Sequence, residues 1–168
     1  ITSIDFNSRY DTNIINPNYL QTDINFQTQG TKSDNQAITG DAVFTNITGL
    51  SSNLITSKEA SAMITTMIFG SISGNNARLL IRLNINRNGT ITTYPNDTGW
   101  SFYDAGAGTT GHREQKTFSW VTSLAPGVNT INIQAARSAP DESMTVMGTS
   151  DSVSSFTIQT VGAYVGTA

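Results

Sequence analysis

The clearest structural pattern in this chain is found in Arg78-Leu79-Leu80-Ile81-Arg82-Leu83-Asn84-Ile85. From Leu79 to Ile85 every second residue is leucine or isoleucine, whereas Arg82 and Asn84 fall on the alternate positions. Side chains of a β-strand point in turn to opposite faces of its sheet, so this period of two predicts a strand with one buried face and one polar face.

The neighbouring segments extend this strand into a sheet. Asn88-Gly89 follows it, and this pair accepts the positive φ angles of a tight hairpin turn, so Ile91 to Tyr94 is the expected return strand. Upstream, Ala62 to Ser73 carries apolar residues on both of its faces. A strand with that pattern is expected at the centre of a sheet and covered on both sides.

The rest of the chain repeats the same pattern at close spacing, without helical segments in between. The polar stretch Gln29 to Thr39 is expected to be a loop. Further strands are expected at Leu20 to Gln27, Ala42 to Thr48, Thr117 to Val121, Val128 to Arg137, Met144 to Met147 and Val153 to Val165. The chain is therefore predicted to be all-β, an antiparallel, jelly-roll-like β-sandwich of roughly eight to ten strands.

The expected domain organisation is simple. A chain of 168 residues has enough material for one hydrophobic core, and we assign residues 20–168 to a single sandwich domain. Residues 1–19 show weaker patterning, broken by asparagine, aspartate and Pro17. They are expected to form an N-terminal arm that docks on a neighbouring molecule.

The composition excludes several classes of function. Only 12% of the residues are charged, against about 25% in an average domain, and the net charge of -3 has the wrong sign for binding nucleic acid. No run reaches the roughly 20 apolar residues of a membrane span. The chain has no cysteine, which excludes disulfides, thiolate catalysis and cysteine-ligated metal sites.

No organised catalytic group emerges from the motifs. Gly106 to Gly111 matches the glycine spacing of a dinucleotide-binding loop, but a strand follows where that site needs a helix, so we read it as a flexible loop. His112, the single histidine, is expected in the same loop, without the motif that would orient a serine nucleophile. The acidic pair Asp141-Glu142 has the character of a solvated turn. We therefore expect no enzymatic activity, no cofactor and no metal.

A group of aromatic residues is the more credible binding feature. Tyr94, Trp100, Phe102 and Tyr103 lie close together in the sequence, next to the glycine-rich segment with His112. Such aromatics stack on sugar rings or anchor a protein partner. The alternative is that they belong to the core or to a subunit interface. We take Tyr94, Trp100, Tyr103 and His112 as candidate contacts to a ligand or partner.

Several segments resemble a known family. They are Ile47 to Ser51, the turn Leu124-Ala125-Pro126-Gly127, the strand that ends at Gln134-Ala135, and Ser155 to Ile158. In these the chain resembles bacteriophage β-sandwich virion domains, namely capsid decoration, fibre-head and receptor-binding modules. The resemblance implies a jelly-roll or tumour-necrosis-factor-like sandwich, often trimeric, that has a structural or attachment role in a virion and no catalytic residues.

The hypothesis that follows is a non-enzymatic virion structural protein, a capsid decoration or tail or head-fibre domain, which is located in the virion or extracellularly. It is expected to form a homotrimer, to contact other virion proteins such as a capsid or tail protein, and to attach to a host, where a surface glycan is one candidate partner. Two alternatives stay open: a carbohydrate-binding module, and a subunit of a self-assembling extracellular filament.

Overall fold

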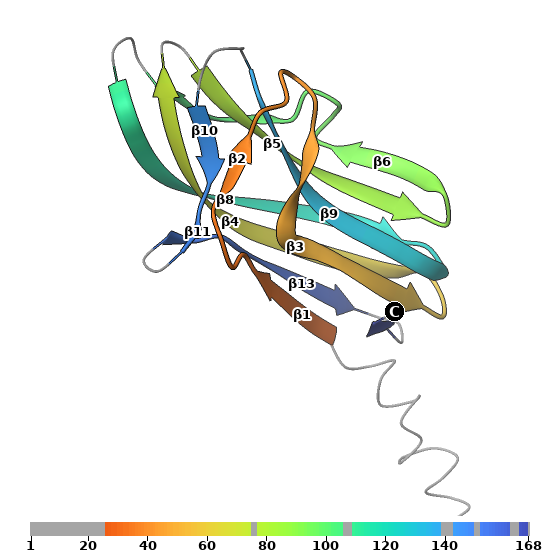
Figure 1. Ribbon diagram of the computed structural model, residues 1–168. Coiled ribbons are helices and arrows are strands. Elements are labelled where there is room, and N and C mark those ends of the chain that lie inside the picture. The colour runs from red at the N-terminus through yellow and green to blue at the C-terminus, as the bar shows by residue number, and fades with distance from the viewer. Residues whose placement is uncertain are drawn as a thin grey trace, which may run out of the picture.

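Two antiparallel β-sheets pack face to face in this protein (Figure 1). The structure, a computed structural model, describes residues 26–74, 77–105, 109–138, 143–149, 152–161 and 165–167. These residues contain strands and no helix, so the predicted all-β sandwich is confirmed. Within them, no helix is long and apolar enough to cross a membrane.

Sheet A has six strands. They are β1 (Phe26–Thr31), β2 (Gln36–Ile38), β4 (Ala60–Gly74), β8 (Thr109–Leu124), β10 (Ser143–Val146) and β13 (Ser155–Val161). The long strand β4 lies at the centre, with β8 along one side and with β13 and β10 along the other. β1 pairs with β13 and β2 pairs with β10, so these two strands lie at the opposite edge from β8.

Sheet B also has six strands. They are β3 (Thr45–Thr56), β5 (Ala77–Arg87), β6 (Thr90–Tyr94), β7 (Trp100–Ala105), β9 (Gly127–Arg137) and β14 (Val165–Thr167). β9 and β5 occupy the centre, and both β6 and β7 pair with the far side of β5. A small third sheet joins β11 (Gly148–Thr149) to β12 (Ser152–Val153).

The chain crosses repeatedly between the two sheets, from β3 to β4 to β5 and from β8 to β9 to β10. This double-sheet arrangement is that of a jelly roll. Ten of the described strands have at least four residues, and β2, β11, β12 and β14 are shorter. The ten longer strands agree with the expected number, and the short ones carry too little sequence for a period to be recognised.

The core confirms the alternation predicted for Leu79 to Ile85. Leu79, Ile81, Leu83 and Ile85 are fully buried, and they face inward on β5 beside Ile131, Ile133 and Ala135 of β9. Sheet A contributes Ile64, Ile68 and Ile72 from β4. The sandwich thus holds one continuous apolar layer between its sheets, as the period of two requires.

The segment Gln29 to Thr39 differs from the expected loop. Its first residues continue β1 as far as Thr31, and Gln36–Ile38 forms β2 against β10. The polar sequence is compatible with strands because both lie at the edge of sheet A, where one face is open to solvent. The proposed arm, residues 1–19, lies outside the described residues, and so does the start of the expected strand Leu20 to Gln27.

Candidate functional site

An aromatic seam closes one side of the sandwich. Trp100 of β7 in sheet B stacks on two rings of β8 in sheet A: its ring centroid lies 5.3 Å from that of Trp120 and 5.7 Å from that of Phe118. Trp120 and Phe118 are buried, whereas 37% of Trp100 is exposed. The stack therefore joins the edges of the two sheets and leaves one indole partly open to a ligand or partner.

A polar network continues the seam at Tyr94. Thr122 of β8 donates a hydrogen bond to the phenolic oxygen of Tyr94 at 3.1 Å, and the guanidinium of Arg87 donates another at 3.3 Å. Arg87 also reaches the hydroxyl of Thr122 at 2.7 Å. The hydrogen bonds from Thr122 and Arg87 lower the pKa of Tyr94, and they outweigh the partial burial, which raises it.

The structure brings together two of the four residues that the sequence singled out. Tyr94 and Trp100 both lie on the seam, on strands that pair with β5. Tyr103 lies in β7, but its side chain is outside the described part of the structure. Whether any of these residues contacts a ligand stays a prediction.

His112 does not lie in a glycine-rich loop, so that expectation was wrong. It belongs to β8, where its backbone is opposite Ile72 of β4. β4 runs to Gly74, and β8 follows it as far as Thr109, with a register irregularity just beyond Ile72. Pairing along a long central strand therefore overrides the glycine content of this segment. The side chain of His112 is not described.

The chemistry of the seam favours stacking and packing. The indole nitrogen of Trp120 is buried without a hydrogen-bond acceptor among the described residues. Within the same part of the chain, no cluster of three or more histidine, cysteine, aspartate or glutamate side chains is placed to hold a metal ion.

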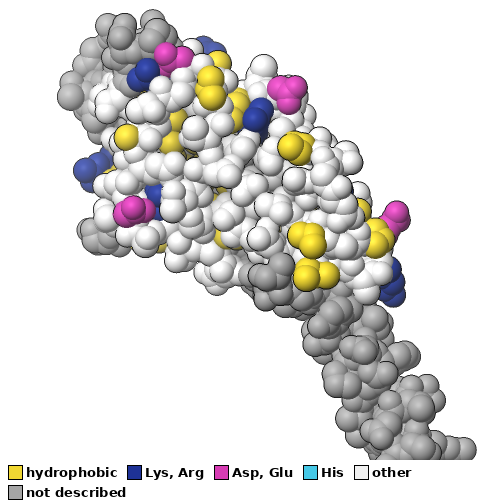
Figure 2. Space-filling model, turned by 45° about the vertical axis from the view of Figure 1, so that its right-hand side comes forward, with side chains coloured by type: hydrophobic (Ala, Val, Ile, Leu, Met, Phe, Trp, Pro, Cys, Tyr) yellow, Lys and Arg dark blue, Asp and Glu magenta, His cyan; other side chains and the backbone are white. Residues whose placement is uncertain are grey.

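The outer face of sheet A is a second candidate surface. The sequence predicted that β4 would be covered on both faces, but among the described residues its outer face is only partly covered. On the outer face Met63 is 46% exposed, and Val121, directly opposite on β8, is 77% exposed. Arg113 is the one charged side chain described on this face. Figure 2 shows how few and scattered the charged side chains are on one face of the molecule.

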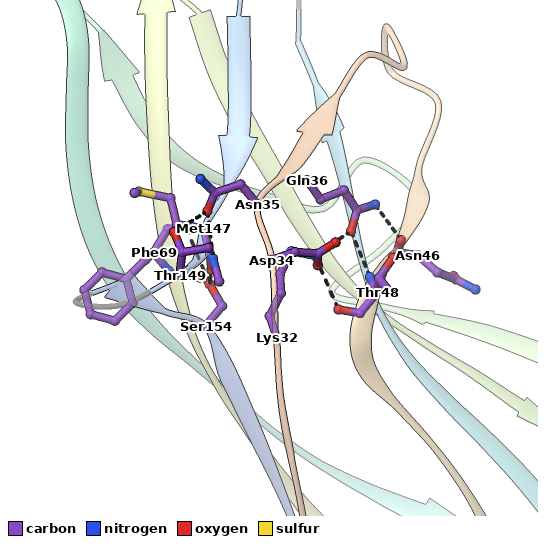
Figure 3. Close-up of polar contacts among 11 residues, drawn as sticks. Lys32, Asp34, Asn35, Gln36, Asn46, Thr48, Phe69, Met147, Thr149 and Ser154 are labelled. Carbon is purple, nitrogen blue, oxygen red and sulfur yellow. Dashed lines mark hydrogen bonds and ion pairs between the residues drawn. The ribbon is translucent and has the colours of Figure 1, made fainter.

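A polar strap, Lys32 to Gln36, crosses beside β3 (Figure 3). The side chain of Gln36 accepts a hydrogen bond from the backbone N–H of Thr48 at 2.8 Å and donates one to the carbonyl of Asn46 at 3.0 Å. The buried ammonium of Lys32 reaches the Gln36 side chain at 3.2 Å and Asp34 at 3.3 Å. The strap thus satisfies backbone groups of β3 where a bulge interrupts its pairing with β9.

A buried serine holds a corner of sheet A, also shown in Figure 3. β10 and β13 pair with the same side of β4, and between them β11 and β12 pair with each other outside sheet A. The hydroxyl of Ser154 accepts a hydrogen bond from the N–H of Phe69 at 3.0 Å and donates one to the carbonyl of Met147 at 2.7 Å. The hydroxyl of Ser154 thus serves as the hydrogen-bond acceptor for the N–H of Phe69 in β4, in place of a main-chain carbonyl.

Sequence reasoning did not identify Lys32, Gln36 or Ser154. Lysine and serine are usually exposed, and no local pattern marks these positions as different from other polar residues. Their partners Thr48 and Phe69 are distant in sequence, so only the folded arrangement reveals their role.

Comparison with known proteins identifies the fold. Neither a protein-family model nor a curated protein matches the chain. Among solved structures, the VP2 subviral particle of infectious bursal disease virus has a TM-score of 0.53 at 16% identity, and it matches 83% of this chain. The structure of the Gt strain of that virus has a TM-score of 0.54, also at 16% identity and 83% of this chain.

A third similar structure is the Eiger TNF from S. frugiperda, with a TM-score of 0.50 and 7% identity over 80% of this chain and 92% of that one. The match spans only 33% and 32% of the two viral chains. These likenesses confirm the fold, an antiparallel, jelly-roll-like β-sandwich. The bacteriophage part of the resemblance stays a prediction.

Proposed function

We propose that this chain is a non-enzymatic structural domain of a virion, which works by self-association through the outer face of sheet A. The proposal rests on a difference between the sequence pattern of β4 and the exposure of its outer face. Its sequence has the pattern of a strand covered twice, yet the outer side chain of Met63 is 46% exposed in one copy. A second copy supplies the missing cover.

The chemistry of this face favours such an interface. Met63 and Val121 form an exposed apolar pair among serine, threonine and glutamine side chains. Burying uncharged side chains avoids the cost of desolvating ions, and burying exposed apolar area stabilises the assembly. The similarity to VP2 of infectious bursal disease virus, whose structure is that of a subviral particle, supports the same role.

The finer form of the proposal is a homotrimer that acts as a capsid decoration or as a tail or head-fibre domain, located in the virion or extracellularly. The family resemblance at Ile47 to Ser51 and at the turn Leu124 to Gly127 supports this form. Its partners would be capsid or tail proteins. Three copies that each contribute the same face make a closed symmetric assembly.

The test is to place a charge on the proposed interface. In the double substitution Met63→Lys and Val121→Lys, two ammonium groups would be buried, so the assembly is expected to dissociate to monomers in sedimentation velocity. Ile91→Lys is the matched control, since Ile91 is 62% exposed on the outer face of sheet B and should leave the assembly intact. A monomeric parent chain, or equal effects of both variants, would contradict the proposal.

A second candidate function rests on Trp100. Its indole is 37% exposed beside a buried stack, which is a suitable platform for a sugar ring. We propose glycan binding there, by the isolated monomer. Binding on a glycan array should be lost in Trp100→Ala and kept in Ile91→Ala, provided both variants keep the parent circular-dichroism spectrum. An array without binding to the parent chain would exclude it.

A further inference from the structure

The edge of β8 is the long strand edge that the described part of the molecule leaves open. β8 has 16 residues and, among the described strands, pairs only with β4. The other long edge strand, β3, gains backbone partners from the polar strap and from β14 at Leu54–Thr56. The edge strands β1, β2, β6 and β7 have at most six residues each.

One half of β8 lacks the usual protection of an edge strand. Arg113 to Lys116 carries three charged residues, and charge discourages the pairing of a further strand. Thr117 to Leu124 has neither a charge nor a proline, and it includes Val121, which is 77% exposed. Within this segment the carbonyl of Ser123 accepts a hydrogen bond from the guanidinium of Arg87 at 2.8 Å. An uncharged edge segment that pairs with a neighbouring strand on one side alone is a template for strand addition.

Residues 1–19 are weakly patterned as a whole, but one segment within them has the alternation expected of a strand. From Ile4 to Ile14 the even positions include four large apolar or aromatic residues, and every odd position is polar. The even residues are Ile4, Phe6, Ser8, Tyr10, Thr12 and Ile14, and the odd residues are Asp5, Asn7, Arg9, Asp11 and Asn13. This alternation over 11 residues is the pattern of a strand with one face to bury.

The register of sheet A indicates how this segment meets β8. Phe26, the first residue of β1, is aligned through β13 and β4 with Thr122 of β8. The chain therefore enters β1 level with the uncharged half of β8, but at the opposite edge of the sheet (Figure 1). Consider a ring of copies related by rotation about an axis that runs along the strands. In such a ring the β1 edge of one copy faces the β8 edge of the next copy, and the two edges lie at the same level along the axis.

We infer that residues Ile4 to Ile14 of one copy add as a strand to the Thr117–Leu124 half of β8 in the neighbouring copy. The apolar face of the added strand lies on the seam side, where Ile4 and Phe6 cover the exposed part of Trp100. The inference rests on the proposed self-association and names a second contact within it. Each copy gives one strand and receives one.

The experiment compares two full-length variants that gain the same charge on opposite faces of the added strand, Phe6→Asp and Asn7→Asp. Amide hydrogen exchange of Thr117–Leu124 and the dissociation constant of the assembly are measured for both. We expect Phe6→Asp to speed the exchange of the free-edge amides and to raise the dissociation constant by about tenfold or more, a change that corresponds to the loss of one well-packed contact. Asn7→Asp should match the parent chain.

A peptide separates strand addition from assembly as a whole. Added in excess to the Phe6→Asp protein, a synthetic peptide of residues 1–19 should restore the slow exchange of Thr117–Leu124, and the same peptide with Phe6→Asp should not. An assembled parent chain with fast exchange in β8 overturns the inference and leaves the proposed function standing. A monomeric parent chain with slow exchange in β8 assigns the strand to the same molecule and overturns both.

Discussion

Ser154 shows how much a single polar side chain contributes to this sandwich. Its hydroxyl is fully buried and serves both Phe69 on the central strand and Met147 at the end of β10. An exposed serine such as Ser119, whose hydroxyl lies 3.1 Å from that of Thr65, has water as an alternative partner. The two serines therefore differ in what their loss leaves unsatisfied.

We expect Ser154→Ala to lower the free energy of unfolding by about 1–3 kcal/mol, because the N–H of Phe69 and the carbonyl of Met147 lose a buried partner. Ser119→Ala, the control, should change it by less than about 0.5 kcal/mol. Urea denaturation followed by tryptophan fluorescence measures both. Equal effects of the two substitutions would show that the hydroxyl of Ser154 does not have this role.

At the scale of elements, the polar strap explains how β3 tolerates a bulge. Register shifts between Asn46 and Ser51, and Gly49 there adopts a φ of +82°. A Cβ at Gly49 would lie 2.7 Å from the carbonyl oxygen of Thr31, so the backbones of β3 and of the end of β1 approach too closely for a larger residue. The side chain of Gln36 forms hydrogen bonds with the carbonyl of Asn46 and the N–H of Thr48, at the bulge where pairing with β9 is interrupted.

Gln36→Met keeps the length of the side chain and removes its polar atoms. We expect the amide of Thr48 to exchange at least about tenfold faster, because its acceptor is lost and a factor of ten needs only about 1.4 kcal/mol. The amide of Ile131, in the centre of sheet B, should exchange as in the parent chain. Slow exchange at Thr48 in the variant would mean that the bulge finds another partner.

The sequence predicts the elements better than it predicts their contacts. The period of two from Leu79 to Ile85 is sufficient to place β5 because each alternate residue meets the same core. Trp100 and Trp120 meet only once two sheets pack face to face, and this pairing depends on register across strands. The position of His112 in β8 likewise follows from the length of β4, which no feature of the glycine-rich segment encodes.

For the whole molecule, the low charge predicts how assembly responds to salt. The outer face of sheet A has one described charged side chain, Arg113, so ion pairs contribute little to the proposed interface. Raising NaCl from about 0.05 M to about 0.5 M should change the dissociation constant by less than about threefold, since screening acts on charges. Sodium sulfate should tighten the assembly, because it strengthens the burial of apolar surface.

Sedimentation equilibrium in both salts measures this response. A steep loss of assembly in NaCl would instead locate the interface at charged residues, such as Arg78 and Arg82 on sheet B. The Ile91→Lys variant provides the control, because its added charge lies away from the face that is expected to associate.

The paired strands β11 and β12 are a suitable place for an insertion. The residues that flank them, Met147 and Ser154, are joined by a backbone hydrogen bond of 3.1 Å from Ser154 to Met147, and both are anchored to Phe69. Because the entropic cost of closing a loop grows only slowly with its length, a foreign peptide introduced after Thr149 should leave the two flanking strands in register. If the domain assembles as proposed, each particle would then display many copies of that epitope.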